Sequence, residues 1–193
     1  MKNIAKIIRN SLKLFSLAII LGTFTQCEIQ DSFEYKASPD NSTLGMTCLE
    51  FIQDRSDIMS MMQDAINRAG MQSYYSENKG YTYILPRNNA WTKYLKSKSY
   101  ATIADIPLVE LQGILKYHLV KAKVNFSDPL LIKSDFPISY DTESGVIMFL
   151  SHNTNFQGLI NQNTKKSWTI ITSNLVPTNG IIHVADDVVY LSQ

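Results

Sequence analysis

The chain has 193 residues, and its 18 lysines and arginines nearly balance its 17 aspartates and glutamates. Because no basic field is present to attract a polyanionic backbone, we expect no nucleic-acid partner. The length suits one domain that buries its core without disulfide bonds.

The N-terminus has the parts of a secretory signal. Four basic residues lie among the first 13, no acidic residue precedes Glu28, and an apolar run of 11 residues covers positions 14–24. This run is shorter than the roughly 20 apolar residues that span a bilayer, so a signal peptide is favoured over a transmembrane helix. We expect residues 1–26 to be removed. Their four basic residues leave with them, so 14 basic residues remain against 17 acidic ones.

Cys27 lies where bacterial lipoproteins carry their lipidated cysteine, and the sequence before it resembles a lipobox with Gln26 in place of a small residue. We predict a lipid on Cys27 and hence a membrane partner; the alternative is an ordinary signal peptide with an incidental cysteine. Residues 27–42 are polar and aperiodic, which favours a flexible tether. Glu28 and Asp31 resemble the acidic export signals of some Gram-negative surface lipoproteins, although a solvated linker would carry acids too. The predicted location is the outer membrane, on the cell surface or the periplasmic face.

Helical patterns begin at Thr47, because the spacing from Thr47 to Glu50 is that of a capping box. Cys48 is predicted to pack as a small apolar side chain, with a nucleophilic role as the alternative. A second helix is predicted to end at Gly70, since apolar residues precede it at helical spacing: Ile58, Met62, Ala65 and Ala69. A third helix is predicted from about Pro107 to Leu119, with an apolar side formed by Leu108, Leu111, Leu115 and Leu119.

Strand patterns occur once within the helical half and repeatedly after it. Residues 80–85 are β-rich and Pro86 follows, so a strand is predicted to end there; Asn88 suits the N-cap of a short helix. From Val124 onward, β-prone runs alternate with turn residues: Leu130–Lys133, Phe136–Tyr140, Val146–Ser151, Phe156–Ile160, Trp168–Thr172 and Ile181–Tyr190. Helices followed by antiparallel strands predict an α+β domain or a helix-decorated β-sandwich.

Three stretches in order resemble the signatures of the fasciclin domain, an extracellular adhesion and binding module: Thr82–Trp91, Leu115–His118 and Thr178–Asp186. The resemblance extends from about Thr43 to Leu191. It implies an α+β, fasciclin-like fold in which helices decorate an antiparallel β-sandwich or wedge. Residues 43–193 would then form a single fasciclin-like domain.

Four signature residues are predicted to have structural roles. Pro86 stops a strand, and Asn179 with Gly180 is expected to supply positive φ angles in a tight turn before the last strand. His183 lies between two β-branched residues, so its ring is expected to be buried and hydrogen-bonded rather than catalytic or metal-binding.

Other residues are candidates for contact with a ligand. Arg87 stands where the family usually has threonine, and Leu85 and Trp91 change neighbouring positions, which is expected to alter the surface near the first signature. Arg87 and the adjacent signature residue Asn88 are therefore candidates for binding. Tyr117 and His118 match a region linked to integrin recognition in animal relatives, with packing of helix against sheet as the alternative; a bacterial setting offers no integrin. Three tyrosines near helix ends would be binding anchors if exposed, or packing residues if not: Tyr74, Tyr75 and Tyr94.

No catalytic or metal motif is found in the sequence. The three histidines are widely separated, and no zinc-binding spacing, nucleophile elbow, phosphate loop or dinucleotide fingerprint occurs. We therefore expect no cofactor, no metal and no enzymatic activity.

The leading hypothesis is a lipid-anchored binding or adhesion module that recognises a protein or carbohydrate ligand. The alternative is an accessory subunit of an outer-membrane or periplasmic protein complex, including one that handles glycans.

Overall fold

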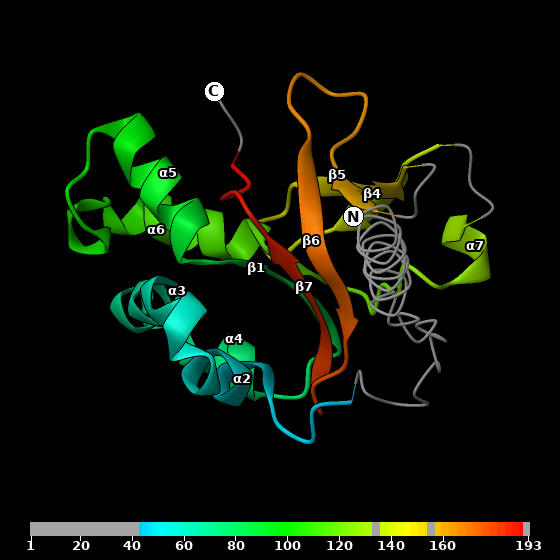
Figure 1. The fold of residues 1–193 in the computed structure, drawn as a ribbon, viewed down its shortest axis with the longest axis horizontal. Coiled ribbons are helices and arrows are strands. Elements are labelled where there is room, and N and C mark those ends of the chain that lie inside the picture. The colour runs from blue at the N-terminus through cyan, green and yellow to red at the C-terminus, as the bar shows by residue number, and fades with distance from the viewer. Residues whose placement is uncertain (1–42, 133–135, 154–156, 191–193) are drawn as a thin grey trace, which may run out of the picture. The chain divides into compact units, whose positions relative to one another are not determined.

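Helices dominate the first half of the described chain and strands the second (Figure 1). The computed structural model describes residues 43–132, 136–153 and 157–190. The predicted signal peptide, Cys27 and the tether through residue 42 lie outside the described residues.

The helices are α2 (Cys48–Asp54), α3 (Ser56–Ala69), α4 (Gln72–Ser76), α5 (Asn88–Lys98), the 3₁₀ helix η1 (Ile103–Asp105), α6 (Leu108–Tyr117) and α7 (Pro129–Ile132). The strands are β1 (Tyr81–Pro86), β2 (Leu119–Val120), β3 (Ile138–Asp141), β4 (Ile147–His152), β5 (Gly158–Ile160), β6 (Trp168–Leu175) and β7 (Gly180–Ala185).

Local sequence signals set the ends of the first two long helices. The Thr47 hydroxyl accepts a hydrogen bond from the Glu50 backbone N–H at 3.3 Å, and the Glu50 carboxylate accepts from the Thr47 N–H at 2.7 Å. This confirms the capping box, which satisfies two backbone donors at the start of α2. Gly70 ends α3 in the left-handed conformation with φ 66°, as predicted.

The prediction of Asn88 as an N-cap is wrong. Arg87 occupies the cap position, and Asn88 is the first residue of α5. The Asn88 amide instead reaches across to α3, where its oxygen accepts from the Met61 N–H at 3.0 Å and its nitrogen donates to the Ser60 hydroxyl at 3.1 Å. A tertiary contact between two helices has replaced the local cap.

The third predicted helix is shorter than expected, because α6 begins after Pro107 and ends before His118. Leu108 is 47% exposed, so it does not belong to the buried side of the helix. The strand predicted from Leu130 is also wrong, since α7 lies there. The Asp128 carboxylate accepts from the Leu130 N–H at 2.8 Å and Pro129 takes the first position, which together start a helical turn.

The strands form one seven-stranded sheet in the order β2-β1-β7-β6-β5-β4-β3. Neighbours are antiparallel except for β1 and β7, which run parallel with Tyr83 opposite Ile182. The sheet is therefore mixed, whereas the sequence indicated antiparallel pairing throughout. Helices and a mixed sheet give an α+β fold, as expected.

The two outer strands of this sheet meet each other. Val120 of β2 bridges to Thr142, which follows β3. The Lys121 N–H donates to the Asp141 carbonyl at 2.8 Å, and the Glu143 N–H donates to the Leu119 carbonyl at 2.9 Å. The sheet thus closes on itself, which pairs backbone groups that an open edge would leave free.

The parallel pair β1 and β7 separates two apolar cores. Side chains alternate across a strand, so Tyr83, Leu85 and Ile182 face the helices, whereas Ile84 and Ala185 face the interior of the closed sheet. Figure 1 shows α2 to α6 on one side of these two strands and β4, β5 and β6 on the other. Both strands end at the same edge, so the segments that follow them, α5 and residues 186–190, begin close together.

Candidate binding surface

The buried side chain of Asn179 connects three parts of the chain. It is 1% exposed; its amide oxygen accepts from the Cys48 N–H at 2.9 Å, and its amide nitrogen donates to the Tyr75 carbonyl at 2.8 Å and the Glu77 carbonyl at 3.2 Å. One side chain therefore holds the start of α2 and the segment after α4 against the start of β7.

Gly180 is required by close approach rather than by its φ angle. The expectation of positive φ at Asn179 and Gly180 is wrong, because neither residue is among those with positive φ. A Cβ atom at Gly180 would lie 2.1 Å from the Tyr81 carbonyl oxygen, well inside van der Waals contact. The parallel pairing of Gly180 with Tyr81 leaves no room for a side chain.

His183 is buried and hydrogen-bonded on both ring nitrogens, as predicted. Nε2 donates to the Val124 carbonyl at 2.9 Å, and Nδ1 accepts from the Asn174 N–H at 3.1 Å. Burial lowers the pKa of His183 from 6.5 to about 4, although the bond to Val124 opposes the shift. The ring is therefore neutral and fixed in one tautomer, with no lone pair left for a metal.

Tyr117 and His118 are also inside the domain, at 3% and 1% exposure. His118 donates from Nδ1 to the Ile114 carbonyl at 2.7 Å and accepts at Nε2 from the Val189 N–H at 3.1 Å. Burial lowers its pKa to about 4. The Tyr117 hydroxyl accepts from the Asn161 amide at 2.8 Å. The expectation that these two residues contact a ligand at the surface is therefore wrong, and the alternative, packing inside the domain, holds. Their polar atoms form hydrogen bonds within the domain.

The three candidate tyrosines differ in exposure. Tyr75 is fully buried and Tyr94 is 3% exposed, so neither tyrosine can serve as an exposed binding anchor. Tyr74 is partly buried, with the Lys79 ammonium 4.3 Å from the centre of its ring. The Tyr94 hydroxyl donates to Glu110, and desolvation together with this bond raises the pKa of Tyr94. These tyrosines stabilise the helical layer.

A charged cluster of Arg87, Lys93, Asp186 and Asp187 lies where β1 and β7 end. The Asp186 carboxylate is 2.6 Å from Arg87 Nε and 2.9 Å from Lys93 Nζ, and Lys93 is 3.5 Å from Asp187. Hydrogen bonds from Arg87 and then Lys93 lower the pKa of Asp186. The cluster joins the segments that follow β1 and β7, and Arg87 supplies its shortest contact.

A cation–aromatic cluster of Tyr94, Lys98, Lys166, Trp168 and Tyr190 adjoins the charged cluster along α5. The Lys166 and Lys98 ammonium groups lie 4.5 and 5.4 Å from the centre of the Tyr190 ring. Lys166 is also 5.1 Å from the centre of the Trp168 ring and donates to the Tyr190 hydroxyl at 3.2 Å. The Tyr94 and Tyr190 rings meet edge to face at 5.3 Å.

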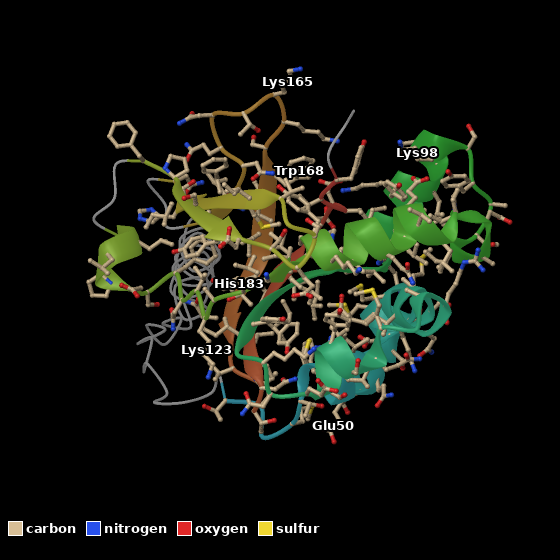
Figure 2. All side chains as sticks on the ribbon, turned by 180° about the vertical axis from the view of Figure 1, so that it is seen from behind. Glu50, Lys98, Lys123, Lys165, Trp168 and His183 are labelled. Atoms are coloured by element: carbon tan, nitrogen blue, oxygen red, sulfur yellow. The ribbon has the colours of Figure 1, made fainter. Side chains whose placement is uncertain are left out.

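Three separate segments build this surface: α5, residues 186–190, and the β5–β6 connection. In Figure 2, Lys98, Lys165 and Trp168 lie toward one edge of the domain, and Lys123 and Glu50 lie toward the other. Sequence reasoning identified Arg87 and Tyr94 as candidates and missed the contribution of the other members. No local pattern brings Lys98, Lys166 and Tyr190 together, because only the sheet order makes them neighbours.

Within the described ranges, no group of three or more His, Cys, Asp or Glu side chains is arranged to hold a metal ion. Cys48 is fully buried, and burial raises the pKa of its thiol well above the usual value, which disfavours the reactive thiolate. Among the helices of residues 43–190 that the structure describes, none is long and apolar enough to cross a bilayer.

Comparison with known proteins identifies the domain. The family model described as "Fasciclin domain" matches residues 57–191. A solved structure, an FAS1 domain pair from the insect cell adhesion molecule fasciclin I, superposes with a TM-score of 0.63 at 18% identity, over 76% of this chain and 51% of that one. The chain thus spans about half the length of that domain pair. The search of curated proteins gives no match. With more than half of its residues matched by the family model, the chain belongs to the fasciclin domain family.

Proposed function

We propose that this protein is a lipid-anchored, extracytoplasmic binding or adhesion module that recognises a protein or glycan ligand through the surface of its domain. The observation that carries the proposal is the meeting of the charged cluster and the cation–aromatic cluster at one end of the domain. Fasciclin domains are in general adhesion and binding modules, and the matched structure comes from a cell adhesion molecule.

The absence of enzymatic activity is part of this proposal. The polar groups that elsewhere perform catalysis are used here for structure: His118 and His183 are neutral and bonded on both nitrogens, and Cys48 is buried. Recognition then depends on exposed ammonium groups and on the partly exposed Tyr190 ring.

The anchor is tested first, by expressing the full-length chain and a Cys27→Ser variant in a Gram-negative host. We expect the parent protein in the membrane fraction with an acylated N-terminal cysteine by mass spectrometry, and the variant in soluble fractions. An unmodified mature N-terminus in the parent would remove the lipid anchor from the proposal.

Surface display and partners are tested on intact cells. We expect protease added outside to degrade the domain, and mild crosslinking followed by proteomics to recover no stoichiometric envelope protein. Complete protection from protease together with one reproducible stoichiometric partner would contradict the adhesion module and favour a subunit of an envelope complex.

A further inference from the structure

Strand β6 runs from the cation–aromatic cluster to the first described residue of the chain. Thr43, the first described residue, bridges to Val176 just beyond the end of β6, and the Leu44 N–H donates to the Val176 carbonyl at 2.9 Å. Trp168 is at the opposite end of this eight-residue strand. At about 3.3 Å per residue, β6 separates Trp168 from the Thr43 bridge by at most about 25 Å.

The cation–aromatic cluster presents positive charge without a matching carboxylate. Among the described residues, no Asp or Glu lies within 4.0 Å of the ammonium groups of Lys98, Lys165 or Lys166. By contrast, Arg87 and Lys93 are already paired with Asp186. Two ammonium groups held near one tyrosine ring form an arrangement that a bound anion would stabilise.

An aromatic donor in the same cluster also lacks a partner. Trp168 is 6% exposed, and its indole N–H has no hydrogen-bond acceptor. A buried donor without an acceptor costs about 1–3 kcal/mol. The indole N–H is too buried to meet a ligand on this surface, so the exposed lysines alone indicate a ligand rich in anionic oxygen atoms.

We propose that this cluster, with the exposed Lys165 beside it, binds an acidic polysaccharide that carries carboxylate or sulfate groups. A sugar polymer combines anionic oxygens for the lysines with apolar C–H faces for the partly exposed Tyr190 ring and the lysine stems. The inference rests on the proposed binding function and names its ligand class.

The charges around the cluster argue against a lipid surface as its ligand. A polybasic membrane site gathers several Lys and Arg side chains without acids, whereas here Asp186 and Asp187 are adjacent.

The test measures binding of the full-length protein, purified in detergent, to polygalacturonate and dextran sulfate by biolayer interferometry at low salt. Neutral dextran, polyglutamate and phosphatidylglycerol vesicles serve as comparison ligands. We expect the double variant Lys98→Gln/Lys166→Gln to weaken polysaccharide binding about tenfold or more, because two charge-assisted contacts are lost. The matched control is Lys121→Gln/Lys123→Gln, which removes two exposed lysines away from the cluster and is expected to change binding less than about twofold.

Absence of binding to both acidic polysaccharides would overturn the inference, and so would an equal loss in the two double variants. If polyglutamate binds as tightly as the acidic polysaccharides or more tightly, the ligand of the cluster is an acidic protein instead. If the vesicles do so, the ligand is a lipid surface. These failures differ from failure of the proposed function: a domain that is displayed on cells and still captures a ligand through another face remains a binding module.

Discussion

At the scale of single residues, Gly180 has less room for a side chain than any other described glycine. A side chain there would meet a backbone oxygen of β1 rather than a flexible side chain, so relief requires β1 and β7 to separate. We expect Gly180→Ala to lower the free energy of unfolding by about 3 kcal/mol, measured by urea denaturation.

A matched glycine supplies the control for this change. Gly113 is exposed within α6, and a Cβ there would meet nothing within 4 Å. Gly113→Ala is expected to raise the free energy of unfolding by about 1 kcal/mol through helix propensity. Similar effects of the two changes would contradict the close contact between Gly180 and Tyr81.

The two buried histidines predict a loss of stability in mild acid. Their pKa values are about 4 in the folded protein and 6.5 when unperturbed, so between these limits the unfolded chain binds more protons. The stability that depends on the two neutral rings is therefore fully present above pH 6.5. As the pH drops toward 4, the free energy of unfolding falls by up to about 1.4 kcal/mol per pH unit for each ring.

The measurement is the urea midpoint of unfolding at several pH values between about 7 and 5. Asp186 stays charged over this interval, because its hydrogen bonds lower its pKa. His183→Gln is expected to reduce the slope by about half, since one ring then remains to titrate. A midpoint that stays constant across this interval would show that the rings do not behave as neutral, buried groups.

At the scale of elements, Asp186 connects the end of β7 to helix α5. It contacts both Arg87 and Lys93, and its side chain is 29% exposed. We expect Asp186→Asn to lower the free energy of unfolding by about 1–2 kcal/mol at low salt. The loss is expected to be smaller at high salt, because water and ions partly screen these ion pairs. Asp187→Asn, which loses a single 3.5 Å contact on a more exposed side chain, should cost a few tenths of a kcal/mol. Equal costs, measured by urea denaturation in both salts, would argue against a shared anchor at Asp186.

How well the sequence predicted an element depended on whether its signal was local. The capping box at Thr47 and the helix stop at Gly70 are decided within a few residues, and both are confirmed. Asn88 was misassigned because the neighbouring helix α3 offered its amide a better partner than its own helix. The apolar run after Asp128 looked like a strand, but the Asp-Pro pair starts a helix there.

At the scale of the whole molecule, the three signatures predicted the fold but not the candidate binding surface. Pro86, Asn179 and His183 are recognisable because each is constrained by the core, and such constraints leave a pattern in the sequence. The cation–aromatic cluster has no such pattern. Its lysines and rings come from α5, the β5–β6 connection and the segment after β7, and they meet only once the sheet has closed.

The place of β7 in the sheet has a consequence for when the protein folds. β7 is the last strand of the described chain, yet it lies between β1 and β6, and both apolar cores include its side chains. Until residues 180–185 have been synthesised, β1 lacks its parallel neighbour and neither core is complete. The helical half of the domain therefore cannot finish its packing before the last described strand has emerged from the ribosome.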